Sequence, residues 1–212
     1  MTKGIVSGVV SNMVTLRVDG PVLQGEICYI TTGGDRLMAE VIKVVGSDVY
    51  VQVFESTRGL KVGSEAEFTG HQLEIQLGPG MLSKNYDGLQ NDLDKMDGVF
   101  LRRGQYTAPL DEDRLWDFEP IVKAGDKVEG SAWLGKVEEN HQPLKIMAPF
   151  QMEGIAVVKS IVPAGQYKVN DTIAVLTTEA GEDINVTMVQ RWPVKFAMTN
   201  YKEKPRPFKL LE

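Results

Sequence analysis

The sequence is poor in the residues that carry most metal and nucleophile chemistry. Its 212 residues include one cysteine, Cys28, and two histidines, His71 and His141. A lone cysteine cannot form an internal disulfide, and Cys28 lies in the strand-like run Glu26–Ile30, where a buried thiol packs as a small hydrophobe. Neither histidine stands at ligand spacing from a cysteine or the other histidine. We therefore expect no metal site and no catalytic triad, and we expect both histidines at the surface.

The chain also lacks long apolar runs and an excess of basic residues. No stretch approaches the roughly 20 apolar residues of a membrane-spanning helix, and Met1–Gly4 does not begin the apolar core of a signal peptide. The net charge is −6, which argues against binding to the phosphates of nucleic acid. The densest basic cluster, Lys202–Arg206, is short and is expected to be solvated. These features predict a cytoplasmic protein without direct membrane insertion and without a nucleic-acid partner.

The first third of the chain has the pattern of short β-strands. Runs rich in Val, Ile, Thr and Tyr alternate with Gly and Asp, as is typical of strands joined by tight turns. The expected strands are Ile5–Val10, Val14–Val18, Glu26–Thr32, Arg36–Val45, Asp48–Phe54 and Glu65–Phe68. Gly33-Gly34 predicts a tight hairpin, because glycine adopts positive φ at little cost, and Gly46–Asp48 predicts another turn. We predict a small closed six-stranded barrel, which leaves no exposed sheet edge.

A connector follows this barrel. Gly78-Pro79-Gly80 indicates a rigid turn, and the apolar spacing of Tyr86–Leu93 predicts a short helix after it. The stretch Gly98–Trp116 is expected to be a loop, and it contains the carboxylates Asp111, Glu112 and Asp113. Hydrolysis by paired carboxylates needs one acid in an apolar pocket, so a charged loop favours a solvated face instead.

A second β-rich unit is predicted from Trp116 to Val186, and it contains a faint internal repeat. Lys123–Val128 resembles Pro163–Val169, and each copy precedes a strand, Trp133–Val137 and Thr172–Leu176. This pattern is typical of two intertwined sheet halves with approximate twofold symmetry. Two similar hairpins in an unrelated sandwich would give the same pattern, so both interpretations stay open.

One segment nearly matches a phosphate-binding loop. Gly130–Lys136 has the required spacing through the lysine, but Val137 occupies the position that must offer a hydroxyl to magnesium. The next residues, up to Pro143, show no helical apolar period, whereas a phosphate loop leads into a helix whose N-terminal amides face the phosphates. We interpret the match as chance.

The region Met147–Val157, with Gly165 and Ile173–Leu176, is similar to the biotinyl and lipoyl carrier domains. Those domains present a modifiable lysine at the tip of a β-turn. Here the corresponding tip, Thr177–Glu182, holds no lysine. The resemblance therefore supports the fold and argues against carrier chemistry. A stand-alone biotinyl- or lipoyl-like β-domain and a generic protein-binding module remain the alternative functions.

Several ordered motifs across the chain resemble the N-terminal part of the catalytic A subunit of V/A-type rotary ATPases. They are Leu60–Gly63, Leu77–Leu82, Tyr86–Gln90, Leu101–Gly104, Trp116–Pro120, Gly125–Val128 and Met188–Val194. Each motif is short, but their joint order and spacing are specific. The resemblance implies a mainly β chain with an N-terminal six-stranded barrel and a barrel-sandwich-like bulge domain, joined by short segments from the edge of an α/β nucleotide domain.

In this resemblance the N-terminal β-barrel spans residues 1–72 and the connector, which is the leading edge of the nucleotide domain, spans 73–109. The bulge domain spans 110–186, and a return segment into the nucleotide domain spans 187–212. The barrel would join a ring of alternating A and B subunits, and the bulge would meet the peripheral stalk. The complex would lie on the cytoplasmic face of a membrane and couple ATP synthesis or hydrolysis to ion transport.

The same resemblance places the phosphate loop, the magnesium carboxylates and the catalytic glutamate after Glu212. We therefore assign no catalytic, cofactor-binding or metal residue to this chain, and expect Mg-ATP or Mg-ADP only in the full-length subunit. The chain by itself is expected not to turn over ATP. The segments 73–106 and 187–212 would expose apolar surface, which predicts weak self-association.

Overall fold

The chain forms two compact units, which are described separately. A computed structural model describes residues 2–96, 98, 100 and 102–197. The first unit consists of Met1–Glu74, Met96–Tyr106 and Pro193–Lys195. The second contains Ile75–Lys95 and Thr107–Trp192, so the chain passes between the units several times. The basic cluster Lys202–Arg206 lies outside the described residues.

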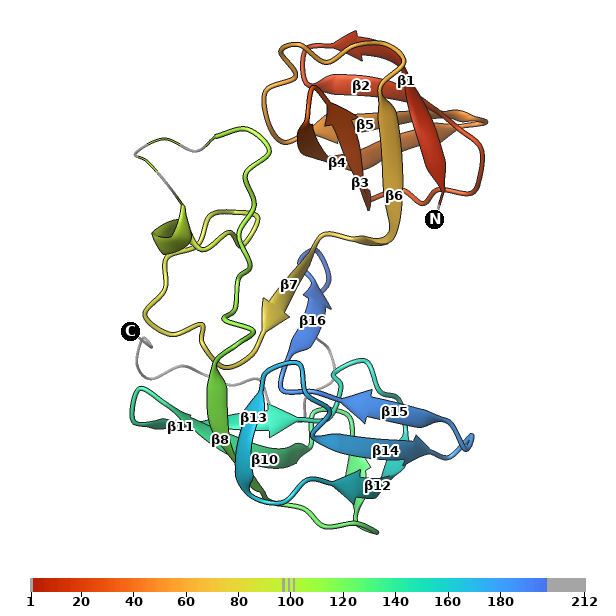
Figure 1. Cartoon of the computed structure of the whole chain (residues 1–212). Helices are drawn as coiled ribbons and strands as arrows, with labels where there is room; N and C mark the ends of the chain where they lie inside the picture. Colours follow the sequence, from red (N-terminus) through yellow and green to blue (C-terminus); the bar gives the residue numbers. More distant parts are fainter. Residues whose placement is uncertain (1, 97, 99, 101, 198–212) are drawn as a thin grey trace. The chain divides into compact units, whose positions relative to one another are not determined.

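Six antiparallel strands close the first unit into a barrel, as predicted (Figure 1). Around the barrel the strands follow the order β1-β2-β5-β4-β3-β6. Their bounds are β1 Lys3–Val10, β2 Met13–Val18, β3 Glu26–Thr32, β4 Asp35–Val45, β5 Asp48–Val53 and β6 Glu65–Gln72. Each predicted strand is present, which confirms that the Gly and Asp residues between them mark turns.

The turns and bulges of the barrel follow from particular residues. Gly33 and Gly34 have φ values of 57° and 94°, the positive values that a two-residue hairpin requires. Bulges interrupt the ladders between Val6 and Gly8 and between Val41 and Lys43, which bends the strands so that the sheet can close. Alternate side chains point inward and form one core of mainly Val, Leu and Ile, with Phe68 the largest.

Two four-stranded sheets make up most of the second unit. One has the order β11-β10-β8-β13 and the other β15-β14-β12-β9. The first contains β8 Leu115–Pro120, β10 Trp133–Glu139, β11 Gln142–Met147 and β13 Gly165–Lys168. The second contains β9 Lys127–Glu129, β12 Ile155–Ile161, β14 Ala174–Thr178 and β15 Asp183–Val186. The mainly β fold class is thus confirmed.

The two sheets have the same internal plan. If β8 to β11 are matched in order with β12 to β15, the first sheet's order becomes that of the second, and each half lends one strand, β9 or β13, to the other sheet. The valines that end the two sequence copies, Val128 and Val169, are both buried. The structure therefore favours two intertwined halves over two unrelated hairpins.

The segment between β7 and β8 contains an element whose type was predicted wrongly. β7 Glu74–Leu77 forms a two-stranded sheet with β16 Gln190–Pro193. The predicted helix at Tyr86–Leu93 is absent; a turn stands there, and a short 3₁₀ helix covers Leu93–Lys95. The Asp87 carboxylate explains this, because it accepts the N–H groups of Leu89 at 2.9 Å and Asn91 at 2.8 Å and so stabilises a turn instead of a helix.

Among the residues that the structure describes, no helix has the length and apolar character needed to cross a membrane.

Candidate interaction sites

In the first unit, a short connecting segment is clamped onto the barrel wall. Arg103 donates from Nε at 2.9 Å and from Nη2 at 2.6 Å to Asp35 Oδ2, the residue that opens β4. Its Nη1 also donates to the carbonyl oxygen of Arg58. A guanidinium suits this role because its donors form a planar fork that can reach a carboxylate and carbonyls together.

Gly104 and Tyr106 both bind the carboxylate of Glu55. Together with Arg103 they form the group of contacts that we call the clamp. Glu55 accepts the N–H of Gly104 at 2.7 Å and the hydroxyl of Tyr106 at 2.8 Å. The Tyr106 oxygen in turn accepts the N–H of Met38 at 2.9 Å. A Cβ on Gly104, where φ is 71°, would lie 3.3 Å from the Cβ of Asp35, so close approach favours glycine. Burial and the hydrogen bond to Glu55 raise the pKa of Tyr106 well above its ordinary value.

In the second unit, a buried acidic side chain binds the connector. Glu139 ends β10 and is buried, with 4% of its surface exposed. One carboxylate oxygen accepts the N–H of Gly80 at 2.9 Å and the N–H of Leu82 at 3.0 Å. The turn predicted at Gly78-Pro79-Gly80, and Leu82 after it, are therefore fixed to the tip of the β10–β11 hairpin. Charge-assisted bonds of this kind are among the stronger ones in proteins.

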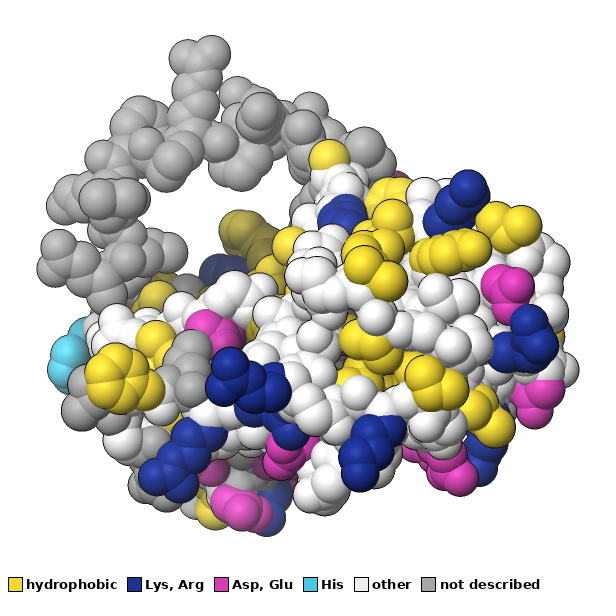
Figure 2. All heavy atoms as spheres, turned by 90° about the horizontal axis from the view of Figure 1, so that it is seen from above, with side chains coloured by type: hydrophobic (Ala, Val, Ile, Leu, Met, Phe, Trp, Pro, Cys, Tyr) yellow, Lys and Arg dark blue, Asp and Glu magenta, His cyan; other side chains and the backbone are white. Residues whose placement is uncertain are grey.

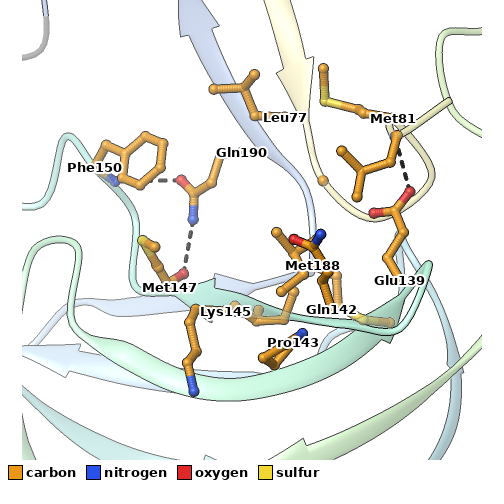
Figure 3. A pocket seen from close by; sticks show the side chains of 14 residues that line it. Leu77, Met81, Glu139, Gln142, Pro143, Lys145, Met147, Phe150, Met188 and Gln190 are labelled. Atoms are coloured by element: carbon orange, nitrogen blue, oxygen red, sulfur yellow. Dashed lines mark hydrogen bonds between the residues drawn. The ribbon is translucent and has the colours of Figure 1, made fainter. Parts of the chain in front are cut away.

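Next to this turn lies an apolar pocket of about 410 Å³ (Figure 3). Figure 3 shows Leu77 and Met81 along one side of the pocket, Met188 and Phe150 along its other sides, and Glu139 at its rim. Pockets of this size with few polar groups are common sites for apolar side chains or ligands. Methionine side chains are flexible, so such a lining adapts to the shape of its occupant.

Gln190 supplies an ordered polar group in that pocket. Its Nε2 donates to the carbonyl oxygen of Met147 at 2.9 Å, and its Oε1 accepts the N–H of Phe150 at 3.4 Å. These bonds tie β16 to the last residue of β11 and to the loop after it (Figure 3). The ammonium group of Lys145 points away from the pocket. The pocket is therefore largely apolar, and its Gln190 and Glu139 side chains already have hydrogen-bond partners.

The near-match to a phosphate loop folds differently from such a loop. Gly130 and Ser131 form a turn, and the chain then continues as strand β10 instead of a helix. Lys136 pairs with Glu119 at 2.6 Å. A Cβ on Gly135 would lie 2.2 Å from the ring of Phe118, so packing explains that glycine. The segment has the geometry of a turn and a strand, which cannot present helix amides to phosphate.

The other residues singled out in the sequence do not come together. Cys28 is fully buried, and burial raises the pKa of its thiol to about 12, which makes it unreactive. The side chains of His71 and His141 are 50% and 99% exposed. Among the described residues no group of acidic, histidine or cysteine side chains could hold a metal ion. Thr177–Glu182 covers the end of β14 and the exposed turn that joins β14 to β15.

Sequence reasoning missed the clamp and the pocket because their parts are far apart in the chain. Tyr106 lies 51 residues from Glu55, and Glu139 lies 59 residues from Gly80. The signals in the sequence were the motifs Leu77–Leu82 and Leu101–Gly104, whose residues had no assigned partners. Without a structure, the hydrogen-bond partners of such residues cannot be predicted.

Comparison with known proteins gives the family. The β-barrel domain of the ATP synthase alpha/beta family matches residues 6–70. The ATP synthase alpha/beta subunit barrel-sandwich domain matches residues 107–195. The chain belongs to the ATP synthase alpha/beta family.

Its similar proteins include V-type ATP synthase alpha chains of Borrelia and Treponema species. The chain of Borrelia garinii subsp. bavariensis is 43% identical over 209 residues, which is 97% of this chain and 36% of that protein. The chain of Treponema denticola is 43% identical over 213 residues, 99% of this chain and 36% of that protein. These matches confirm the resemblance to the N-terminal region of the A subunit. The chain spans about a third of the length of these relatives.

Proposed function

We propose that this chain acts as the N-terminal region of the catalytic A subunit of a V-type ATP synthase or ATPase, which couples ATP synthesis or hydrolysis to ion transport. The observation that carries the proposal is the 43% identity over nearly the whole chain to V-type ATP synthase alpha chains. Both β-domains in that order support it further. The parent complex would act at the cytoplasmic face of a membrane.

Within that complex the barrel would serve assembly. It would pack beside the barrels of B subunits in an alternating hexamer, while the bulge domain would dock the peripheral stalk. A closed barrel suits a ring position, because it is rigid and has no free edge strand that would pair with the wrong partner. The clamp at Arg103 and Tyr106 would keep the connector fixed to the barrel while the ring resists torque.

Assembly can be tested by competition. The purified chain is added to full-length A and B subunits, and the yield of hexamer is followed by sedimentation velocity. The proposal expects the chain to lower the yield in proportion to its concentration. A hexamer yield that stays unchanged at a tenfold excess of chain would contradict the assembly role.

Docking of the stalk needs a separate experiment. Immobilised peripheral-stalk subunits are exposed to the chain, and the retained fraction is compared with that of the isolated full-length A subunit. Retention of the chain would support docking through the regions it contains. Retention of the full-length subunit alone would place the docking surface elsewhere and remove this part of the proposal.

Nucleotide binding is proposed for the full-length subunit, with Mg-ATP or Mg-ADP as cofactor, and not for this chain. Isothermal titration of the chain with Mg-ATP is the direct test. The proposal expects no heat of binding. Micromolar affinity would mean that Gly130–Lys136 or another segment holds phosphate after all.

The carrier-domain alternative rests on the barrel-sandwich fold, but the turn tip Thr177–Glu182 has no lysine to carry a prosthetic group. Intact mass after expression with an active biotin or lipoate ligase decides between the two functions. We expect an unmodified mass.

A further inference from the structure

The outer face of β4 is buried where this strand forms part of the barrel wall. Leu37, Ala39 and Val41 belong to the barrel core, so Met38 and Glu40 between them point outward. Each of these two outward residues nevertheless has only 8% of its surface exposed. A glutamate in such a position needs a partner, because a buried carboxylate without one is costly.

Two later segments of the chain bind at these outward positions. The hydroxyl of Tyr106, part of the clamp, accepts the N–H of Met38 at 2.9 Å. Lys195 forms an ion pair with Glu40. It belongs to the segment Pro193–Lys195, which lies in the same compact unit as the barrel and which we call the latch segment. The clamp and the latch segment therefore bind neighbouring outward positions of one strand.

A backbone contact accompanies the ion pair of the latch segment. The N–H of Val194 donates to the carbonyl oxygen of Leu73 at 2.9 Å, just after β6 ends. The indole N–H of Trp192 donates to the carbonyl oxygen of Phe196 at 2.8 Å, which closes a turn around the segment. This turn presents the side chain of Lys195 to β4, and the Val194 amide reports whether the segment is in place.

The clamp and the latch segment differ in how far solvent reaches their contacts. The clamp holds the connector through several hydrogen bonds from three residues. The latch segment depends on an ion pair in which the Lys195 side chain is 60% exposed and the Glu40 side chain 10% exposed. Dissolved ions reach this pair from the lysine side and screen it. When the segment lifts, the Glu40 carboxylate regains water, so opening avoids the full cost of leaving a buried charge unpaired.

We propose that the latch segment is a salt-sensitive strap that opens from β4 while the clamp stays closed. In the closed state Lys195 binds Glu40 and the Val194 amide binds Leu73. In the open state both contacts are lost together, and water reaches the outer face of β4 at Glu40. The chain after β16 can then detach from the barrel without loosening the connector. The inference depends on contacts inside one compact unit, so it stands whether or not the assembly role holds.

The test measures amide hydrogen exchange in the whole chain by NMR, at low and at high NaCl concentration. Protection of the Val194 amide reports the latch segment, and protection of the Met38 amide reports the clamp in the same spectra. Rates are divided by those of an unfolded reference peptide at the same salt concentration, so that the effect of salt on exchange itself cancels.

Three substitutions separate the ion pair from a general effect of charge. Lys195→Met removes the ammonium group, whereas Lys195→Arg keeps a positive charge that can still pair with Glu40. Lys43→Met is the matched control, because Lys43 is an exposed lysine on the same strand. Lysine and arginine side chains are spread over the face that Figure 2 displays, several beside Asp or Glu, so the loss of one charge needs such a control.

We expect Lys195→Met to lower the protection of the Val194 amide by about tenfold, because the pair is neither fully exposed nor fully buried. High salt should lower this protection in the unmodified chain and in Lys195→Arg, and should have no further effect in Lys195→Met. The Met38 amide should keep its protection in every case. Lys43→Met should behave as the unmodified chain does.

Three results would overturn the inference. The first is a Val194 amide that is equally protected in Lys195→Met and in the unmodified chain. The second is an equal loss of protection at Met38, which would mean that clamp and latch segment open as one. The third is a Val194 amide that does not respond to salt in the unmodified chain, a measurement that needs no substitution and so does not depend on the folding of any variant.

Discussion

The barrel and the barrel-sandwich unit are both built almost wholly of strands, but they differ in how the chain connects those strands. In the barrel, β1–β2, β3–β4 and β4–β5 are hairpins between consecutive strands. In the second unit, β13 pairs with β8 and β12 pairs with β9, so each half completes the other's sheet. The barrel can form largely from local pairings, whereas the second unit needs both halves at once.

Their cores differ as well. The barrel has one cluster of mainly aliphatic side chains, while the second unit has two clusters, one of which includes Trp116 and Phe118. All three tryptophans of the chain, Trp116, Trp133 and Trp192, belong to the second unit. Tryptophan fluorescence therefore reports on that unit alone, and far-UV circular dichroism reports on both. This difference allows each unit's stability to be measured in the same chain.

The largest effect is expected from Phe68→Ala in the barrel. Phe68 is 1% exposed and is the largest side chain in the barrel core, so its loss leaves a cavity and should lower the free energy of unfolding by about 4 kcal/mol. Urea unfolding should then show an early phase by circular dichroism, with the tryptophan transition unmoved. A tryptophan transition that shifts equally would show that the two units unfold as one.

The reverse experiment uses Gly135→Ala in the second unit. A new Cβ would lie 2.2 Å from the Phe118 ring and 2.9 Å from the carbonyl oxygen of Glu119, so the strands must separate. We expect a loss of about 3 kcal/mol, seen as an earlier tryptophan transition and as an early phase by circular dichroism, while the part of the circular dichroism transition that belongs to the barrel stays in place. Gly8→Ala in β1 is the control, because its Cβ would meet Thr15 at an ordinary 3.8 Å.

A second substitution sharpens the test at Gly135. Phe118→Leu removes the ring that the new methyl group would strike, so the double variant should lose less stability than the two single variants added together. Strictly additive losses would mean that the close approach to Phe118 does not explain this glycine.

The difference in connection also explains which parts of the fold could be predicted. Gly33-Gly34 and the other turn residues divide the barrel into strands without knowledge of distant partners, and every strand was found. In the second unit the repeat suggested two halves, but only the structure shows that they exchange strands. Tyr86–Leu93 has helical apolar spacing, yet the Asp87 carboxylate binds the local N–H groups first. Periodicity alone does not reveal that competition.

The candidate sites were the least predictable part. The resemblance to a family supplied roles for whole domains, but it gave no function to Glu139, Arg103 or Tyr106. Each acts on groups more than forty residues away. The fold class follows from local patterns, whereas a contact between distant residues depends on the finished topology.

We expect the segment Gly80–Leu82 to be held more tightly on the second unit than the segment Gly104–Tyr106 is held on the barrel. Glu139→Ala removes the acceptor of two buried N–H groups and is expected to cost about 2 kcal/mol, with faster amide exchange at Gly80 and Leu82. Glu139→Gln is the control, since its amide oxygen can still accept both bonds. Equal exchange rates in the alanine and glutamine variants would show that the carboxylate does not fix this turn.

In the barrel, Tyr106→Phe tests the corresponding contact. The substitution removes the hydroxyl between Glu55 and the N–H of Met38 but keeps the ring against Tyr29. We expect a loss of about 1 kcal/mol by circular dichroism and none in the tryptophan transition. Faster exchange of the Met38 amide would locate the effect, and an unchanged amide would contradict the assigned bond.

The smallest effects are expected at two exposed ion pairs of the second unit. The hydrogen bond and charge of Lys168 lower the pKa of Asp113, and Lys159 together with the Thr177 hydroxyl lowers the pKa of Asp183. Lys168→Met should return the pKa of Asp113 to near its ordinary value of 3.8, while Lys159→Met should return that of Asp183 only in part, because Thr177 still donates at 2.7 Å. Carboxyl NMR titration measures both values.

These two pairs also make a prediction about pH. A lowered carboxyl pKa contributes stability that is present above the unfolded-state pKa and is lost as pH falls through the folded-state value. The contribution should therefore be present at neutral pH and disappear below about pH 3.8. Because both pairs lie at the surface, solvent screens them, and neither lysine variant should shift the tryptophan transition measurably at neutral pH. A clear shift at neutral pH in Lys168→Met would mean that the Asp113–Lys168 pair helps to hold the two halves together.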